Sequence, residues 1–351
     1  MKFSKVSSVL LAAALISGCG GNYKPTAPQF STLVSFGDSL SDVGTYRVGG
    51  VAALGGGEFT INSPADKIWV EDLASALSLP APCAAETGLD GSAAYGFNVP
   101  VTTHAGCNGY AQGGARVTNP VGPGNAALGG SNALIGMLTT PVVTQLSNYL
   151  TANSGAFTGK ELVTVWAGAN DVFIQLDTVA AGAESPTQAA AALEVAAAQE
   201  AGYINAEILG KGANYVLVMN LPDISLTPSG LAEPVADQAF IQLLTQAYNT
   251  ALAASLAASP ASKVLLFDTY TASHNEVTNA TTYGLTNTTT PACNLAPAAN
   301  PLASSLICSS ANLAGANVLN YEYADDVHPT PFAHALLAKG VLNAMTAKGW
   351  Y

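Results

Sequence analysis

Residues 32–44 read Thr-Leu-Val-Ser-Phe-Gly-Asp-Ser-Leu-Ser-Asp-Val-Gly, an apolar run that passes directly into a polar turn. A short apolar run bounded by turn residues is typical of a buried strand. Ser39 lies in the turn that follows this run. In open α/β sheets, binding clefts form at the carboxyl ends of the strands. The stretch therefore predicts a sheet strand over 32–36 and makes Ser39 a candidate functional residue.

Strand and helix patterns alternate along the rest of the chain. Further strands are expected at 162–166, 215–219 and 264–267, and helices at 66–79, 186–209, 237–258 and 331–347. Ser185 and Gln188 have the spacing of a helix capping box. This alternation predicts an α/β domain in which helices cover both faces of a mainly parallel sheet.

Three long segments rich in Gly, Thr, Asn and Pro interrupt the alternation, at 44–64, 80–131 and 270–320. We expect them to be insertions in loops, because mere connections of this length are unusual. Segment 80–131 either forms a wall of a binding site or is an ordered surface loop, and the sequence favours neither. For segment 270–320 the surface loop is favoured.

A second polar motif, Asp-Asp-Val-His-Pro at 325–329, lies near the other end of the chain. A serine hydroxyl is a weak nucleophile until a base removes its proton, and an imidazole serves best when a carboxylate fixes its tautomer. The three-residue step lets Asp325 reach Nδ1 of His328, so that the far nitrogen faces Ser39. Each motif has a structural alternative, a helix start for the second and a strand-to-loop turn for the first. Their joint occurrence favours a catalytic serine.

Two further motifs lie between these ends. Residues 108–116 read Asn-Gly-Tyr-Ala-Gln-Gly-Gly-Ala-Arg, and residues 166–171 read Trp-Ala-Gly-Ala-Asn-Asp. Together and in this order, the four blocks resemble the GDSL, or SGNH, family of serine esterases and lipases. The resemblance implies a three-layer, flavodoxin-like α/β/α domain, which we place at 32–351.

The resemblance also implies roles for three residues of the two outer blocks. Ser39 would be the nucleophile, His328 the base, and Asp325 rather than Asp326 the carboxylate that orients it. The expected reaction is hydrolysis of a small-molecule or lipid carboxylic ester through an acyl-enzyme. Acyl transfer and carbohydrate acetyl ester hydrolysis by the same residues are alternatives. A different class, a surface-binding lipoprotein without catalysis, is a further alternative.

The two inner blocks supply the expected oxyanion donors. The resemblance assigns a backbone N–H to Gly114 and the side-chain amide to Asn170, and the N–H of Ser39 completes the set. Such preorganised donors stabilise the oxyanion that forms when an ester carbonyl is attacked. The structural alternatives are an ordinary tight turn at Gly114 and a helix N-cap at Asn170.

The N-terminal residues have the pattern of a targeting segment. Lys2 and Lys5 precede an apolar run at 9–16 that is too short to span a bilayer. Ser-Gly-Cys follows this run, and the sequence resembles a bacterial lipoprotein signal. We therefore expect a signal peptide over 1–18, lipidation of Cys19 and a lipid-anchored linker over 19–31. A plain secretory signal is the alternative. The expected location is the cell envelope, at the outer membrane of a Gram-negative bacterium.

Charge excludes some classes of partner. The formal net charge is −12, and Lys and Arg together number only 11 in 351 residues. Nucleic acid binding is therefore disfavoured, because it depends on basic side chains that neutralise phosphates. An acidic surface also disfavours binding to anionic lipid headgroups, which leaves the lipid anchor as the expected membrane contact. We expect a monomer.

Four cysteines remain once Cys19 is assigned to the anchor, and an even number in an exported chain predicts disulfide bonds. Three pairings are possible, of which Cys83–Cys107 with Cys293–Cys308 is favoured because both pairs flank loop-rich segments. Zinc is the rival interpretation, but the sequence has no Cys-x-x-Cys pair. His104, His274 and His334 also lack metal-ligand spacing. We expect no metal and no other cofactor.

Overall fold

The computed structural model describes residues 27–65 and 67–351. The expected signal peptide over 1–18, the lipidation site Cys19 and linker residues up to 26 lie outside the described residues. So does Asp66, at the start of one expected helix. Among the residues that are described, no helix is long and apolar enough to cross a membrane.

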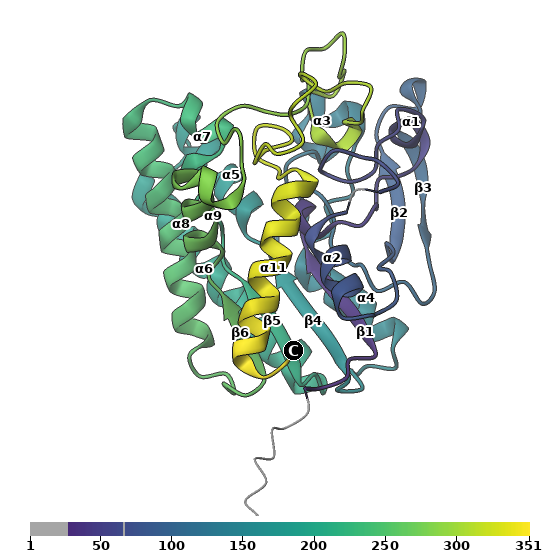
Figure 1. Cartoon of the computed structure of the whole chain (residues 1–351), viewed down its shortest axis with the longest axis vertical. Helices are drawn as coiled ribbons and strands as arrows, with labels where there is room; N and C mark the ends of the chain where they lie inside the picture. Colours follow the sequence, from purple (N-terminus) through teal and green to yellow (C-terminus); the bar gives the residue numbers. More distant parts are fainter. Residues whose placement is uncertain (1–26, 66) are drawn as a thin grey trace, which may run out of the picture.

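A parallel sheet forms the centre of the described chain (Figure 1). Its strands are β1 (Thr32–Gly37), β4 (Glu161–Trp166), β5 (Tyr215–Met219) and β6 (Val264–Phe267), and they lie in the order β1-β4-β5-β6. Leu33 pairs with Leu162, and Val163 pairs with Val216. The predicted strands at 215–219 and 264–267 are confirmed, and the other two extend one residue beyond the prediction.

The remaining elements are a hairpin and the helices. The hairpin strands are β2 (Glu86–Asp90) and β3 (Asn98–Thr103). The helices are α1 (Gly49–Ala53), α2 (Trp69–Ala76), α3 (Gly130–Ile135), α4 (Val142–Ala152), α5 (Ala169–Ala180), α6 (Pro186–Tyr203), α7 (Pro228–Ala232), α8 (Val235–Leu256), α9 (Thr269–Thr278), α10 (Ala280–Tyr283) and α11 (Pro331–Lys348).

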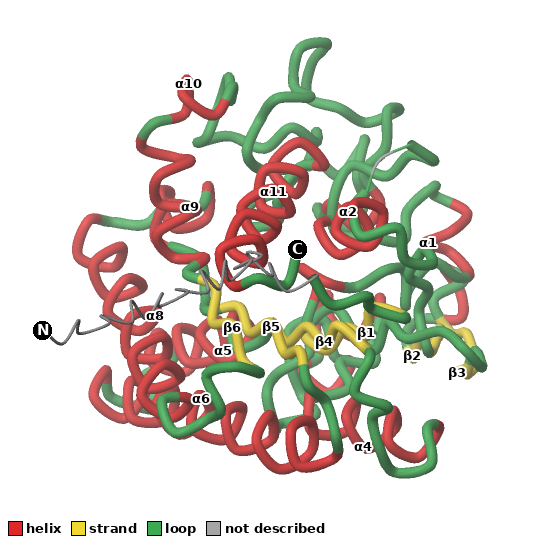
Figure 2. The backbone as a smooth tube through the Cα atoms, turned by 60° about the horizontal axis from the view of Figure 1, so that its bottom comes forward, coloured by secondary structure: helices red, strands yellow, loops and turns green. Residues whose placement is uncertain are grey.

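Helices cover both faces of the sheet, which confirms the expected α/β fold. Figure 2 shows α2 and α11 on one side of the strands and α4, α5 and α6 on the other. Successive strand residues alternate between these layers because side chains of a strand point to opposite faces. The side chains that pack toward α4, α5, α6 and α8 include Val34, Val163 and Val216, and those that pack toward α2 and α11 include Leu33, Leu162 and Leu217.

A short segment at 108–112 extends the sheet beyond β1. Ser35 forms a parallel bridge with Gly109. The N–H of Tyr110 donates to the carbonyl of Ser35 at 2.8 Å, and the N–H of Gln112 donates to the carbonyl of Gly37 at 3.1 Å. With this segment beside β1, the strand order in chain sequence becomes 2-1-3-4-5, the flavodoxin-like order. The direction of winding therefore reverses at β1, where such folds bind their ligands.

The two disulfide bonds have the favoured pairing. Cys83 is bonded to Cys107, and Cys293 is bonded to Cys308. The first closes part of segment 80–131, which also contains the hairpin of β2 and β3. The second closes part of segment 270–320, which consists mostly of turns and short helices.

The predicted helices at 237–258 and 331–347 match α8 and α11 to within two residues at each end, whereas the other two differ more. The expected helix at 66–79 is shorter, because α2 begins after Ile68, whose N–H donates to Oε2 of Glu71 at 2.9 Å. The expected helix at 186–209 is regular only to Tyr203, after which Ile204–Ile208 forms a wider, π-helical turn. Its predicted capping box is confirmed, since the N–H of Ser185 donates to Oε1 of Gln188 at 2.9 Å and Oγ of Ser185 accepts from the N–H of Gln188.

Candidate active site

Ser39 lies immediately beyond the carboxyl end of β1. Gly37 has a φ of +146°, and a Cβ there would lie 2.0 Å from the carbonyl oxygen of Trp166, so only glycine fits. Asp38 then caps a single 3-10 turn over Ser39–Ser41 by accepting from the N–H of Leu40 at 3.1 Å. This turn places Ser39 at the carboxyl ends of the strands.

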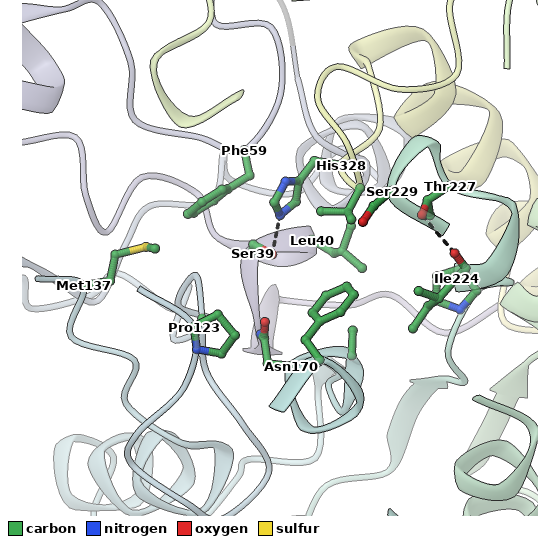
Figure 3. Close-up of a pocket in the computed structure, with 15 residues that line it drawn as sticks. Ser39, Leu40, Phe59, Pro123, Met137, Asn170, Ile224, Thr227, Ser229 and His328 are labelled. Atoms are coloured by element: carbon green, nitrogen blue, oxygen red, sulfur yellow. Dashed lines mark hydrogen bonds between the residues drawn. The ribbon is translucent and has the colours of Figure 1, made fainter. Parts of the chain in front are cut away.

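His328 connects Ser39 to Asp325. Its Nε2 lies 2.8 Å from Oγ of Ser39, and its Nδ1 lies 2.9 Å from each carboxylate oxygen of Asp325. Figure 3 shows the imidazole above the serine, joined to it by a hydrogen bond. Asp325 makes this contact, as the resemblance implied, whereas Asp326 is exposed. The helix-cap alternative does not hold for this carboxylate, because the cap of α11 is the side chain of Thr330.

Backbone donors hold the Asp325 carboxylate. Its Oδ1 accepts from the N–H of Val327 at 3.0 Å and of His328 at 2.8 Å, and its Oδ2 accepts from the N–H of Ser305 at 2.7 Å. Burial alone would raise the pKa of Asp325, but the charge of His328 and these hydrogen bonds outweigh burial and hold the pKa well below its usual range. The carboxylate therefore remains ionised beside the imidazole.

Three contacts fix the His328 loop and ring. The carbonyl of His328 accepts from the N–H of Ala324 at 2.7 Å, which closes the loop on itself. The ring of Phe59 packs against the imidazole, with ring centroids 4.9 Å apart. The neighbouring Thr60 donates its hydroxyl to the carbonyl of Pro329 at 2.9 Å. Segment 44–64 therefore supports the histidine and is more than a surface loop.

Gly114 lies in a turn whose geometry requires glycine. Its φ is +76°, and a Cβ there would lie 2.1 Å from the carbonyl oxygen of Pro123. The preceding N–H, that of Gly113, donates to Oδ2 of Asp42 at 2.9 Å. Over residues 27–65 and 67–351, no hydrogen-bond acceptor contacts the N–H of Gly114 or of Ser39. Both N–H groups are therefore free to bind a substrate oxygen.

Asn170 lies in the first turn of α5. The helix cap is Gly168, so the N-cap alternative for Asn170 does not hold. Its Nδ2 donates one hydrogen to the carbonyl of Ala115 at 2.8 Å, which orients the amide and leaves its second hydrogen. The N-terminus of α5 adds partial positive charge at the same place. The arrangement can stabilise an anion.

Asp171 joins the two inner blocks. Its Oδ1 accepts from Nε of Arg116 at 2.8 Å, and its Oδ2 accepts from the N–H of Val117 at 3.0 Å. Burial raises the pKa of Asp171, while the Arg116 charge opposes that shift. The contact fixes the segment that follows Gly114 against the start of α5.

A buried tyrosine packs against the residue that precedes α5. Gly168 has a φ of +108°, and a Cβ there would lie 2.3 Å from the Tyr248 ring. The Tyr248 hydroxyl donates to Oε2 of Glu200 at 2.5 Å, inside the core. Burial raises the pKa of Glu200 to about 8, so the carboxyl is protonated at neutral pH.

A cavity of about 250 Å³ opens over Ser39 and His328. The groups around it are mostly apolar. They are Leu40, Phe59, Gly114, Pro123, Met137, Ala169, Asn170, Phe173, Pro222, Ile224, Thr227, Ser229 and Val327. Segment 80–131 therefore does contribute to a wall, through Gly114 and Pro123. Segment 270–320 contributes no lining residue to this cavity, although its Ser305 holds Asp325.

The aromatic residues beside Asn170 and the remaining histidines have structural contacts. Trp166 is buried and donates Nε1 to the carbonyl of Asn220 at 3.0 Å, whereas Phe173 lines the cavity. His104 contacts the hydroxyl of Thr87, His274 contacts the Asp223 carboxylate, and His334 is buried in packing. In the part of the chain that the structure covers, no group of three or more His, Cys, Asp or Glu residues could hold a metal ion.

Sequence reasoning missed several residues that hold this site. The motifs contain Asp42 and Asp171 but predict no role for either residue. No motif marks Ser305 or Tyr248. Asp171 directly follows Asn170 and Asp42 lies three residues after Ser39, and these positions were an available signal. Ser305 acts through its backbone N–H, which leaves no mark on the sequence.

Comparison with known proteins agrees with this geometry. A search of curated proteins found no match to the chain. A family model described as GDSL-like lipase/acylhydrolase matches residues 33–341 and so includes all four blocks. The match covers most of the chain and extends from β1 into α11. The chain thus belongs to the GDSL-like lipase/acylhydrolase family, whose members are carboxylic ester hydrolases.

Proposed function

We propose that this protein is an exported serine esterase that hydrolyses carboxylic esters through an acyl-enzyme on Ser39. The observation that carries the proposal is the 2.8 Å contact between Oγ of Ser39 and Nε2 of His328, at the floor of an apolar cavity. A hydroxyl in hydrogen-bond contact with an oriented imidazole is the arrangement required for nucleophilic attack.

The mechanism follows from the contacts. His328 accepts the Ser39 proton as Oγ bonds to the ester carbonyl carbon, and Asp325 stabilises the imidazolium that forms. The oxyanion lies against the N–H groups of Ser39 and Gly114 and the free amide hydrogen of Asn170. His328 then returns its proton to the departing alcohol oxygen. Water repeats the sequence on the acyl-enzyme and releases the carboxylic acid.

The proposed location rests on the sequence and the cysteines. The N-terminal pattern supports export and lipidation at Cys19, which would anchor the domain to the cell envelope, at the outer membrane of a Gram-negative bacterium. The disulfide bonds Cys83–Cys107 and Cys293–Cys308 suit an oxidising compartment. Metabolic labelling with a fatty acid tests this point, since Cys19→Ser should abolish incorporation of the label.

Hydrolysis of p-nitrophenyl acetate and butyrate by residues 20–351 tests the activity. Ser39→Ala should lower kcat by a factor on the order of 10⁴ or more, whereas Ser147→Ala, at an exposed position on α4, should leave it unchanged. A serine-directed phosphonate should add its mass to the wild type and not to Ser39→Ala. A folded protein that neither turns over these esters nor reacts with the phosphonate would instead support a binding lipoprotein. Capture of the acyl group by added alcohol would identify acyl transfer.

A further inference from the structure

The cavity over Ser39 has two ends of different character. In Figure 3, Phe59, Pro123 and Met137 lie on one side of the Ser39–His328 pair, and Ile224, Thr227 and Ser229 lie on the other. We call the first set the Met137 lobe and the second set the Ser229 lobe. An ester carbonyl held at Ser39 has two substituents, an acyl chain and an alcohol, so the two lobes can each take one.

The Met137 lobe is apolar. Phe59 is only 4% exposed. Met137 packs against a cluster of buried side chains that includes Phe59 and Ile135. The backbone also confines Met137, because a Cβ at Gly124 would lie 1.9 Å from its methyl group. A lobe without polar side chains, backed by core residues, favours a hydrocarbon chain through burial of apolar surface.

The Ser229 lobe is more polar, and one of its residues, Ser229, is exposed to solvent. Thr227 uses its hydroxyl within the loop, where it donates to the carbonyl of Ile224 at 2.9 Å and accepts from the N–H of Gly230 at 3.1 Å. Ser229 is exposed, and its hydroxyl has no hydrogen-bond partner in the described part of the chain. A polar substrate group can therefore bind to Ser229 without displacing an internal contact.

The Ser229 lobe is also attached to the loop that carries the base. The N–H of Ser229 donates to the carbonyl of Asp326 at 3.0 Å. Val327, beside His328, lines the same cavity. The departing alcohol must lie where His328 can return its proton, next to this loop.

We propose that the Met137 lobe binds the acyl chain and the Ser229 lobe binds the alcohol, so that the preferred substrates are aliphatic acyl esters of small hydroxylated alcohols. This inference rests on the proposed esterase function. It assigns Met137 to acyl-chain selection and the Ser229 hydroxyl to recognition of the alcohol.

Two substrate series separate the lobes. The first varies the acyl chain of p-nitrophenyl esters from acetyl to dodecanoyl. The second keeps a butyryl group and varies the alcohol from ethanol to ethylene glycol and glycerol, with acid release followed by pH-stat. For each variant the measured quantity is the ratio of kcat/KM between members of one series. Ratios within a series are insensitive to the fraction of active enzyme.

Met137→Trp fills its lobe and should lower the octanoyl-to-acetyl ratio by about tenfold or more, because even one methylene in an apolar pocket changes kcat/KM by about that factor. Met137→Ala, which enlarges the lobe, should shift the optimum to longer chains. Neither variant should change the glycol-to-ethyl ratio. Ser229→Ala should lower the glycol-to-ethyl ratio by roughly threefold to tenfold, the worth of one hydrogen bond, and should leave the acyl optimum in place. Leu243→Trp, at an exposed position on α8, is the matched control for an added indole.

The outcomes distinguish the inference from the function on which it rests. If the wild type hydrolyses both series and Ser39→Ala does not, the esterase function stands. The lobe assignment is then overturned if Met137→Trp changes the alcohol series, if Ser229→Ala shifts the acyl optimum, or if neither variant changes any ratio. If the folded wild type hydrolyses no member of either series, the esterase function fails and the assignment fails with it.

Discussion

The carboxylate of Asp42 accepts a hydrogen bond from the N–H of Gly113 at 2.9 Å, which joins the turn after β1 to the turn that presents Gly114. Its other oxygen accepts from the N–H groups of Gly44 at 3.0 Å and Thr45 at 2.7 Å. Asp42 is fully buried, so these N–H groups have no water to replace it. A carboxylate outside the residues proposed to react thus positions the turn that carries Gly114, the proposed oxyanion donor.

Replacing Asp42 with Asn should therefore impair both folding and catalysis. One oxygen of the asparagine side chain can still accept from Gly44 and Thr45, but its NH₂ group would then face the N–H of Gly113. Leaving that donor unpaired should cost about 1–3 kcal/mol of unfolding free energy. Urea unfolding checks this cost, and p-nitrophenyl butyrate turnover should fall through kcat rather than KM. Unchanged kcat in a folded Asp42→Asn protein would contradict the positioning role.

Asn170→Ala should lower kcat on short esters by a factor on the order of 10²–10³, because the variant removes one oxyanion donor. The native orientation of α5 is also held by Asp171 and Gly168, so the variant should still fold. Circular dichroism and thermal unfolding check the fold. Asn98→Ala, in the exposed part of β3, is the control for loss of an asparagine side chain. A loss below threefold would show that Asn170 does not bind the oxyanion.

Gly168→Ala should inactivate the enzyme, and Gly182→Ala should not. Both glycines have positive φ values, +108° and +70°, so alanine strains the backbone at each site by about 1–3 kcal/mol. Only at Gly168 would the added methyl group meet another side chain, the ring of Tyr248, and so displace the turn before Asn170. Comparison of turnover between the two soluble variants separates backbone strain from this clash. Equal activity in both would rule out the tyrosine contact as a determinant of the site.

Because Glu200 is protonated in the folded state, the unfolding free energy should fall as the pH rises from about 5 to 8. Burial raises the folded-state pKa of Glu200 to about 8, whereas the unfolded chain titrates near about 4.3. Between these values the folded state holds a proton that the unfolded state has lost, so the unfolding free energy falls with pH, by roughly 1 kcal/mol per pH unit for one group.

The substitution Glu200→Gln keeps an acceptor for Tyr248 and removes the titration. Urea unfolding at pH 5, 6, 7 and 8 should therefore show a shallower decline in the variant than in the wild type. Any constant destabilisation by the new amide would shift the whole curve without changing its slope. Parallel curves would mean that the buried carboxyl does not hold its proton in this range.

The sequence predicted the central sheet closely because its strands are mostly apolar runs between turn residues, and β1, β4 and β5 are buried on both faces. The same rule explains what was missed. The segment at 108–112, Asn-Gly-Tyr-Ala-Gln, has no apolar run, yet it pairs with β1 through its backbone. β3 is mostly exposed and carries no burial pattern that could reveal it.

The candidate site was predicted through the side chains that are proposed to react. The residues that hold these side chains in place were not predicted. Ser39, His328 and Asp325 lie in short motifs, and the structure brings all three into hydrogen-bond contact. The contact of Ser305 with Asp325 depends on a backbone N–H from a distant loop, whose placement follows from tertiary packing alone. The fit of the Tyr248 ring beneath Gly168 likewise depends on how α8 packs against α5.

Two side chains at the ends of the cavity and two of the groups proposed for catalysis come from separable parts of the chain. Ser39 lies in the tight turn after β1, and Asn170 lies in the first turn of α5, just after β4. Met137 and Ser229 belong to longer connections between the strands. Loops tolerate insertion and exchange far better than strand ends do. Directed evolution for new substrates can therefore be confined to libraries around Met137 and Ser229, with the sheet, its turns and the loop residues Gly114, Asp325 and His328 kept constant.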